Sequence, residues 1–360
     1  MKTKILFLLP RFRKGGEVKN TLNILNALDT DCFDLTLLIC KKGENDYRHL
    51  LEKKIRFIEI ESKTPIWAFY HIIKTLHSIR PDITFTSFID LNFIVGIYKV
   101  LTFRKIVSVL RFNTMPSSTI SADLGFPVTR KIKKESVRSA TRILAQSFEM
   151  RDEIMKYYPK YKNKVEVIPN IINRGQIIKL ANEYIPFESS TGTTLVAVGN
   201  LWVAKGFEFL IRAVEKLKND NNLSVRLFII GENIVHNSDY DLYLKNLIKD
   251  LNLENEVFLE GYKINPYPYM KHADVFVLSS LKEGFPNVVL EALTLRIPCV
   301  VTDCVDFSSI IKSGSNGYIV EKASVNSLVH GLLKVKNINF RTEQTVDFDF
   351  NKWILSIAIC

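Results

Sequence analysis

Short apolar runs alternate with helix-like amphipathic segments along the whole chain. The first half contains the runs KILFLL, DLTLLIC, DITFTS and RILAQS, separated by stretches such as VKNTLNILNAL and PIWAFYHIIKTLHSI. The second half repeats this scheme with TTLVAVG, VRLFIIG, DVFVLS and PCVVTD. Apolar runs without polar alternation are typical of strands buried on both faces, and helices between such strands indicate right-handed crossovers in a parallel sheet. The pattern therefore predicts an α/β protein built from βα units.

The two sets of βα units predict two Rossmann-like, doubly wound domains that face each other across a cleft. A chain of 360 residues suits two domains of ordinary size. The polar, poorly periodic segment from Asn173 to Gly192 lies between the two sets. We expect one domain over residues 1–175, a second over residues 176–340, and a final segment, 341–360, that returns to the first domain. Ligands of such sheets bind where the strands end and loops lead into helices.

We expect a cytoplasmic protein whose contact with a membrane is peripheral. The first apolar run, Ile5 to Leu9, ends at Pro10 without a cleavage site, so it predicts a buried strand rather than a signal peptide. The longest later run, LNFIVGIYKVL, is well short of the ~20 residues that a membrane span needs. The scattered cysteines form no C-x-x-C pair and are predicted to be reduced packing residues. They are Cys32, Cys40, Cys299, Cys304 and Cys360.

The positive charge of the chain is concentrated in its first half. Residues 1–185 contain 32 Lys and Arg against 18 Asp and Glu, a net charge of +14, whereas the remainder has 17 against 20, a net charge of −3. The segment TRKIKKESVRSATRILAQS predicts a basic helix that leads into a strand. Its cations are Arg130, Lys131, Lys133, Lys134, Arg138 and Arg142.

A basic helix of this kind can lie against anionic lipid, and we expect residues Arg130 to Arg138 to face a membrane. The alternative is a solvated charged face, which is the usual role of a charge run. Nucleic acid is not expected as a partner, because no helix-turn-helix, RNP-type aromatic pattern or zinc finger accompanies the charge.

Two glutamates flank a turn in SSLKEGFPNVVLEALTLRIPCVVTD. Glu283 and Glu291 stand eight residues apart around a Gly-Phe-Pro-Asn turn that follows the predicted strand DVFVLS. The turn suits a helix start with Asn287 as N-cap, and the free N–H groups of the first helical turn would attract an anion, above all phosphate. The carboxylates would accept hydrogen bonds from hydroxyls of the same ligand. Taken alone, the pattern also fits a Glu291 that only favours the helix dipole and a solvated Glu283.

These residues belong to a series of motifs that resembles the retaining GT-B glycosyltransferases of family 4. EGFPNVVLE matches the E-x7-E signature of that family, and GGE resembles its glycine-rich loop after the first strand. VIPNIIN resembles the segment between the domains, and VGNLWVAKGFEFLIRAV the motif that opens the second domain. IIGEN, VFLEGY, ADVFVLSS, PCVVTD and SGSNGYIV follow in the family's order. The resemblance implies the GT-B fold and a nucleotide diphosphate sugar as donor substrate.

The resemblance also implies a role for the matched residues. Glu291 would bind the ribose hydroxyls, Glu283 the hydroxyls of the transferred sugar, and Lys205 would neutralise the diphosphate as it leaves. The catalytic residues are then Glu283, Lys205 and Arg111. The donor would be held by Gly15, Gly16, Asn113, Gly199, Asn200, Lys205, Gly231, Tyr262, Glu283, Gly284, Phe285, Pro286, Asn287, Val288, Val289 and Glu291.

One position departs from the family's pattern. Asn200 stands where the family usually has an arginine, so either another cation supplies the charge or diphosphate binding is weakened. Arg111 is a candidate for that charge, because it follows a predicted strand and precedes Asn113, in a place where some members have a similar Arg-Asn pair. The alternative is that Arg111 is a solvated loop charge.

The mechanism that the resemblance implies retains the anomeric configuration without a protein nucleophile. The acceptor hydroxyl would attack on the face that the diphosphate leaves, and a phosphate oxygen would take its proton, so that positioning and charge stabilisation dominate. No metal or cofactor is expected. The triplet Asp347 to Asp349 imitates the metal-binding D-x-D of the other glycosyltransferase fold, and we assign it to a solvated turn.

We therefore expect a hexosyltransferase that uses a UDP-linked hexose or N-acetylhexosamine and extends a lipid-linked cell-surface glycan, such as lipopolysaccharide or capsule, at the inner face of the plasma membrane. Asn200 keeps open a catalytically weak subunit that only binds the nucleotide sugar. A nucleotide-sugar 2-epimerase of the same fold is a further alternative. It would need additional acidic and histidine residues in the cleft, whereas His71 and His77 lie in a helix-like segment.

Overall fold

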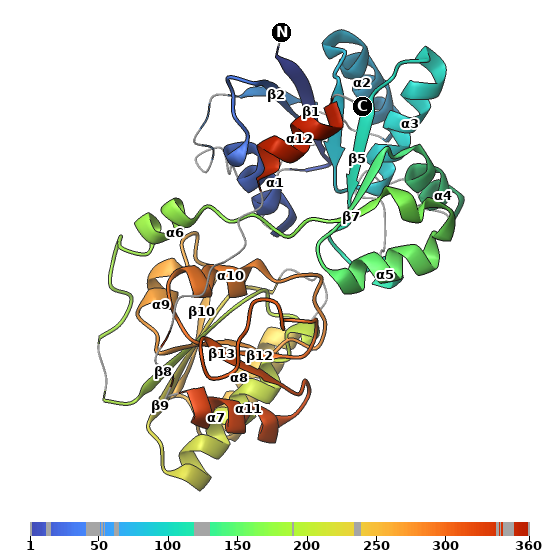
Figure 1. The fold of residues 1–360 in the computed structure, drawn as a ribbon. Coiled ribbons are helices and arrows are strands. Elements are labelled where there is room, and N and C mark those ends of the chain that lie inside the picture. The colour runs from blue at the N-terminus through green and yellow to red at the C-terminus, as the bar shows by residue number, and fades with distance from the viewer. Residues whose placement is uncertain are drawn as a thin grey trace. The chain divides into compact units, whose positions relative to one another are not determined.

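The chain forms two compact units. Our computed structural model describes residues 2–11, 16–40, 51, 53, 55–60, 65–118, 130–188, 191–233, 239–335, 338, 340 and 349–358. Unit 1 comprises Met1–Ile171 together with Asp347–Cys360, and unit 2 comprises Ile172–Val346. The last helix, α12 (Phe350–Ala358), packs within unit 1 against α1 (Gly16–Ala27) (Figure 1).

Unit 1 is built on a seven-stranded parallel sheet with the strand order β3-β2-β1-β4-β5-β6-β7. The strands are β1 (Thr3–Leu9), β2 (Phe33–Ile39), β3 (Arg56–Glu59), β4 (Ile83–Thr86), β5 (Val107–Arg111), β6 (Arg142–Ala145) and β7 (Val165–Val167). Besides α1 and α12, the helices are α2 (Pro65–Ile79), α3 (Ile89–Thr102), α4 (Arg130–Ser139) and α5 (Phe148–Tyr157), with short 3-10 helices η2 (Pro116–Ser118) and η3 (Pro159–Lys164).

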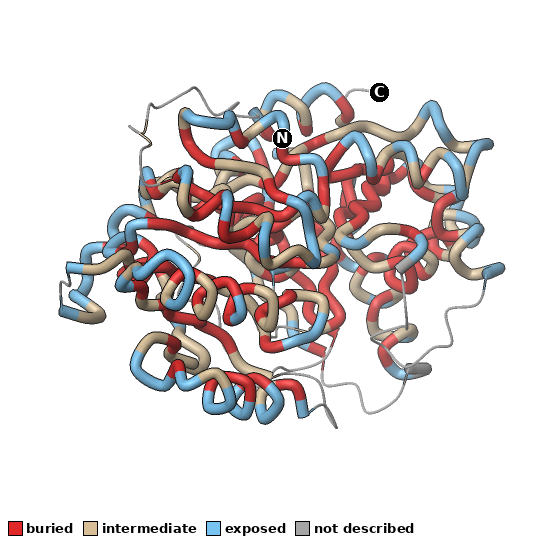
Figure 2. The backbone as a smooth tube through the Cα atoms, turned by 90° about the horizontal axis from the view of Figure 1, so that it is seen from below, coloured by how far each residue is buried: buried red, intermediate tan, exposed pale blue. Residues whose placement is uncertain are grey.

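Helices cover both faces of this sheet, because successive residues of a strand point to opposite faces. Phe7 of β1 packs in the core that α1 and α12 complete, whereas its neighbour Leu8 packs with α2 and α3. The register places Leu8 beside Thr86, and Thr86 beside Leu110. Leu110 packs against residues of α4 and α5. Helices α2 to α5 therefore form one layer over one face of the sheet. Figure 2 shows the strands buried and the outer turns of the helices exposed.

Unit 2 is built on a six-stranded parallel sheet with the order β10-β9-β8-β11-β12-β13. The strands are β8 (Thr193–Val198), β9 (Val225–Ile230), β10 (Val257–Gly261), β11 (Val275–Leu278), β12 (Cys299–Thr302) and β13 (Gly317–Val320). The helices are α6 (Arg174–Leu180), α7 (Phe207–Asn221), α8 (Tyr240–Asp250), α9 (Tyr267–Lys271), α10 (Asn287–Thr294) and α11 (Val325–Val335), with the 3-10 helix η4 (Val203–Lys205).

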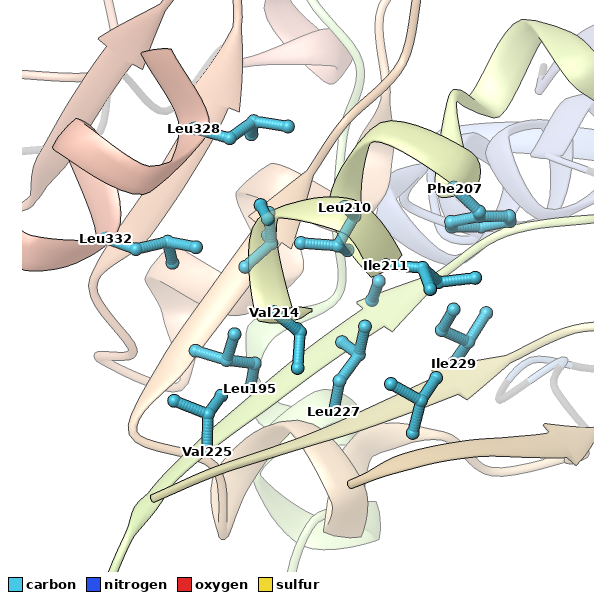
Figure 3. Close-up of a cluster of buried hydrophobic side chains, with 14 of the residues drawn as sticks. Leu195, Phe207, Leu210, Ile211, Val214, Val225, Leu227, Ile229, Leu328 and Leu332 are labelled. Carbon is cyan, nitrogen blue, oxygen red and sulfur yellow. The ribbon is translucent and has the colours of Figure 1, made fainter. Parts of the chain in front are cut away.

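The core of unit 2 also lies on both sides of its sheet. Leu195 of β8 packs with α7, α8 and α11, and Figure 3 shows Leu210 and Val214 of α7 above it. The next residue, Val196, packs with α6, α9 and α10 on the other face. The apolar run Leu195 to Val198 of β8 thus serves two cores, as the sequence pattern predicts.

Each sheet reverses its strand order once. In unit 2 the chain runs outward from β8 to β10 and then returns to β11, which pairs with the other side of β8. In unit 1 the same reversal lies between β1 and β4. Loops that leave neighbouring strands toward opposite sides make room for a ligand at the carboxyl edge of the sheet. The predicted pair of doubly wound parallel sheets is confirmed.

Candidate functional site

The loops after β8 and β11 are tied together at the carboxyl edge of unit 2. The Ser279 hydroxyl donates to the carbonyl oxygen of Lys205 over 2.9 Å, and the Leu281 N–H donates to the carbonyl of Ala204 over 2.8 Å. These bonds join two segments that are far apart in the sequence. A side chain on either loop is therefore held in place relative to the other loop.

This junction brings Lys205 and Glu283 together. The Nζ of Lys205 lies 2.5 Å from Oε1 of Glu283, which also accepts a hydrogen bond of 2.8 Å from the Ser280 hydroxyl. Both charged side chains remain partly accessible, with 20% of Lys205 and 15% of Glu283 exposed. Sequence analysis missed Ser280 as a site residue. Its signal was its place close to the end of a buried strand, in the same loop as Glu283.

Glycines allow the close approach around Lys205. A Cβ on Gly199 would lie 3.1 Å from Cε of Lys205, so a larger residue would push the lysine stem away. A Cβ on Gly231, which directly follows β9, would lie 1.8 Å from the carbonyl oxygen of Gly199. Gly231 therefore needs to be glycine, whereas a larger residue at Gly199 would only displace the Lys205 side chain.

The N-terminus of α10 begins one residue earlier than predicted. Pro286 is the N-cap, with φ −78° and ψ 110° and no capping side chain, so the prediction of Asn287 as N-cap is wrong. The extended Pro286 already provides the carbonyl that accepts from the Val289 N–H over 3.2 Å, which leaves Asn287 as the first helical residue. Gly284, Phe285, Asn287 and Val288 are half-buried around this helix start, and Val289 is buried.

Glu291 lies on the buried side of α10. It is 1% exposed, and its neighbours Val289, Ala292 and Leu293 on that helix are also buried. Burial of a carboxylate is unfavourable unless polar groups surround it. A favourable interaction with the helix dipole would not require Glu291 to be buried. The dipole alone therefore does not explain the burial of this side chain.

In unit 1 a chain of polar side chains crosses the carboxyl ends of β5, β6 and β7. Arg111, the last residue of β5, donates from Nη2 to the carbonyl of Ile168 over 3.1 Å and to Oδ1 of Asn170 over 2.7 Å. The Nδ2 of Asn170 donates to Oε1 of Gln146 over 3.2 Å. Gln146 in turn donates from Nε2 to Oδ1 of Asn113 over 2.8 Å. This network fixes Arg111 and Asn113 relative to each other.

Arg111 is completely buried, so the alternative of a solvated loop charge is wrong. Burial lowers the pKa of Arg111 to about 9, which leaves the guanidinium charged at neutral pH. Among the described residues, Nε and Nη1 of Arg111 find no hydrogen-bond acceptor. Nδ2 of Asn113 finds no acceptor among them either. Sequence analysis missed Gln146 and Asn170. Both follow a buried strand directly or closely, which is the signal that could have identified them.

The other predicted residues fall in several places. Gly16 is the exposed first residue of α1, while Gly15 lies outside the described residues. Asn200 and Tyr262 are half-buried after β8 and β10. Asp349, the described member of the DFD triplet, accepts from the Lys352 N–H over 3.0 Å and so caps α12.

The predicted basic helix is α4. Its side chains Arg130, Lys131, Lys134 and Arg138 are exposed, and Lys133 is half-buried. Arg142, which belongs to the same sequence segment, is the first residue of β6 and lies 3.1 Å from Glu166. Within the described part of the chain, no helix combines the length and the apolar character needed to cross a bilayer.

Two doubly wound units, with charged loops at a strand reversal, define a two-domain α/β protein of the Rossmann-like class. The family model Glycosyltransferase Family 4 matches residues 14–176, and Glycosyl transferases group 1 matches residues 185–347. The chain belongs to the GT-B glycosyltransferases.

Curated relatives agree with this assignment. An uncharacterized glycosyltransferase of Methanocaldococcus jannaschii is 31% identical over 283 residues, which cover 73% of this chain and 66% of the relative. The N-acetylgalactosamine-N,N'-diacetylbacillosaminyl-diphospho-undecaprenol 4-alpha-N-acetylgalactosaminyltransferase of Campylobacter jejuni is 32% identical, over 54% of this chain and 50% of the relative. The UDP-Gal:alpha-D-GlcNAc-diphosphoundecaprenol alpha-1,3-galactosyltransferase of Escherichia coli is 26% identical, over 56% and 52%. The matches thus span about half to two thirds of these relatives.

Solved structures share the fold. Anabaena HepE in complex with UDP and glucose has a TM-score of 0.75 at 18% identity, over 93% of this chain and 92% of that chain. The lipopolysaccharide outer core galactosyltransferase WaaB has a TM-score of 0.67 at 18% identity, over 94% and 92%. The GT-B fold predicted from the motifs is confirmed.

Proposed function

We propose that the protein is a retaining glycosyltransferase that moves a hexose or N-acetylhexosamine from a UDP sugar to a lipid-linked cell-surface glycan. The observation that carries the proposal is the contact between Lys205 and Glu283 at the strand reversal of unit 2. A nucleotide diphosphate sugar offers an anion for the lysine and hydroxyl groups for the glutamate. A relative whose name includes UDP-Gal, and a fold neighbour bound to UDP and glucose, support this choice of donor.

Lys205 would stabilise the negative charge that develops on the leaving diphosphate. Its ammonium group is a compact charge, and Gly199 leaves room for its stem at the end of β8. Within the described chain, the bonds from Lys205 and Ser280 both go to Oε1 of Glu283, which leaves Oε2 to accept a hydrogen bond from a sugar hydroxyl. Glu291 would bind the ribose hydroxyls.

The diphosphate would lie at the N-terminus of α10, where the first N–H groups of a helix favour an anion. We propose that Gly15 and Gly16 also bind the donor, since a backbone without side chains allows close approach of a phosphate. Asn200 contributes no charge, and we propose that Arg111 compensates for it. No carboxylate of the described residues pairs with the buried guanidinium of Arg111, and such a charge is costly. An anionic ligand nearby would explain why this charge is kept.

A lipid-linked acceptor is supported by two relatives whose names specify acceptors on diphospho-undecaprenol. The exposed cations of α4 suit an anionic membrane surface, where each Lys or Arg contributes about 1 kcal/mol. We therefore place the enzyme at the cytoplasmic face of a membrane, in contact with the bilayer only at its surface.

The reaction would proceed with retention and without a metal ion. The acceptor oxygen attacks the anomeric carbon on the face that the diphosphate leaves, and a diphosphate oxygen takes the proton of that hydroxyl. Lys205 then supplies charge stabilisation that needs no metal. Transfer should persist in EDTA, and NMR of the product should show the anomeric configuration of the donor. Inversion, or loss of activity on chelation, would contradict this mechanism.

The function is tested with a panel of nucleotide sugars, by detection of the released nucleotide diphosphate with and without a lipid-linked acceptor. Glu283→Ala and the isosteric Glu291→Gln should abolish transfer, whereas Glu254→Ala, an exposed glutamate of the same unit, should not. Unchanged transfer in both site variants would refute the assignment. Binding of UDP by the wild type without any transfer would instead favour the catalytically weak subunit.

A further inference from the structure

The polar side chains that follow β5, β6 and β7 form a hydrogen-bond chain with a fixed direction. An amide side chain can be turned either way unless its partners decide which end is the nitrogen. The guanidinium of Arg111 only donates, so the atom of Asn170 that it meets at 2.7 Å must be the oxygen Oδ1. The nitrogen of Asn170 then faces Gln146 and donates to its Oε1 over 3.2 Å.

The other end of this chain is fixed by a backbone carbonyl. The oxygen of Phe112 only accepts, so the group of Gln146 that lies 3.0 Å from it must be the nitrogen Nε2. The same nitrogen also donates to Oδ1 of Asn113 over 2.8 Å. The two ends therefore agree on one direction, and each amide oxygen of the chain accepts from a donor within it.

The side-chain atoms that this chain leaves without a partner are all donors. Among the described residues, Nε and Nη1 of Arg111 and Nδ2 of Asn113 find no acceptor. These three atoms are buried, and so are the side chains of Arg111 and Gln146 as a whole. A buried donor without a partner is costly, and several at one place indicate a missing group. A ligand that brings negative charge and only acceptor atoms would remove this cost.

We infer that the carboxyl ends of β5 to β7 bind a phosphoryl group, and that Gln146 is a positioning residue that turns the amide nitrogen of Asn113 toward it. Phosphoryl oxygens only accept and carry negative charge, which matches a guanidinium and an amide N–H. A sugar hydroxyl fits less well, because its O–H would need an acceptor that this chain does not offer. Asn170 orients Arg111 in the same way. The inference rests on the proposed function, since the nucleotide sugar or a diphosphate-linked acceptor supplies the phosphoryl group.

The test compares Gln146→Met with Asn113→Ala in the full chain, by calorimetry with UDP and with uridine. Methionine keeps the length of glutamine but cannot donate, so either end of the Asn113 amide can then face the ligand. We expect each variant to bind UDP roughly tenfold more weakly and uridine as the wild type does, because one hydrogen bond to an anion is lost. The double variant should bind UDP within about threefold of Asn113→Ala, because Gln146 acts mainly through Asn113.

Asn92→Leu is the matched control for a loss of stability. Asn92 is a fully buried amide of the same unit, and it donates to the carbonyl of Ser136 over 2.7 Å where α3 packs on α4. Its replacement should destabilise the fold as Gln146→Met does and leave UDP binding unchanged. The inference is overturned if Asn92→Leu weakens UDP binding as much as Gln146→Met, or if the double variant shows both losses in full. Gln146 would then be a structural residue only.

Steady-state kinetics of Gln146→Met and Asn113→Ala distinguish the two sources of the phosphoryl group. A raised KM for the nucleotide sugar assigns the group to the donor. A raised KM for the lipid-linked acceptor, with UDP binding unchanged, assigns it to the diphosphate of the acceptor. Unchanged UDP binding together with an unchanged KM for both substrates overturns the inference. Inorganic pyrophosphate tests the site without any transfer, and weaker binding of it by both variants supports the site even if no sugar is moved. The two proposals can therefore fail separately.

Discussion

Gly206 is the residue whose replacement should most directly separate the two loops of the candidate site. It lies between η4 and α7 with φ 59°, and a Cβ at this position would lie 2.3 Å from the carbonyl oxygen of Ser279. Real Cβ atoms do not approach so closely, and the obstacle is backbone rather than a flexible side chain. In Gly206→Ala the β8 loop must therefore move away from the β11 loop, and Lys205 must move away from Glu283.

The expected loss of stability has two parts. A left-handed backbone conformation costs a non-glycine residue roughly 1–2 kcal/mol, and relief of the overlap adds about 1–3 kcal/mol. Gly206→Ala should therefore lower the free energy of unfolding by about 2–5 kcal/mol. Gly261→Ala is a matched control, because Gly261 has φ 69° but its Cβ would meet nothing within 4 Å. It should lose only about 1–2 kcal/mol.

Urea unfolding of the three proteins measures these differences, and calorimetry measures UDP binding. We expect Gly206→Ala to bind UDP more weakly than Gly261→Ala, since only the first variant displaces Lys205. Equal destabilisation of the two variants would show that the overlap with Ser279 is relieved at no cost. Unchanged UDP binding by Gly206→Ala would refute the link between loop spacing and the site.

Further predictions concern single side chains. Lys205→Met should lower kcat by about 100-fold or more in the UDP-release assay, because the cation opposite the diphosphate is lost; a rate within threefold of the wild type would count against its role. Gln146→Leu should lower the free energy of unfolding by about 1–3 kcal/mol, since the bonds to Asn113 and Asn170 are lost, and urea unfolding checks this value. Burial lowers the pKa of Lys99 from 10.5 to about 8. The unfolded chain therefore holds this proton more tightly, so the contribution of Lys99 to stability should rise between pH 8 and pH 10.5. The difference in unfolding free energy between wild type and Lys99→Met should change in that window, and a constant difference would contradict the shift.

The motifs identified the two charged residues of unit 2 but not their contact. Lys205 and Glu283 belong to separate sequence motifs, and each follows an apolar run that predicts a strand. Their 2.5 Å contact depends on β8 and β11 being neighbours, with Ser279 bonded to the β8 loop. Strand order is a property of the whole sheet, so no local pattern could supply it.

Arg111 shows the same limit in unit 1. Its position after a predicted strand left a ligand-binding cation and a solvated charge both open. The structure buries it under groups supplied by Ile168 and Asn170, whose positions depend on β7 pairing with β6. Whether a charge is buried depends on every element around it, so sequence spacing could not decide this question.

The sequence by itself determined the fold class, the two units and the segments that carry the site, because apolar runs that serve two cores and helices between them allow few other arrangements. Only the tertiary structure decided which loops meet and which charges are buried. These features arise from contacts between elements far apart in the chain, and the free energy of each contact depends on neighbours that no single segment contains.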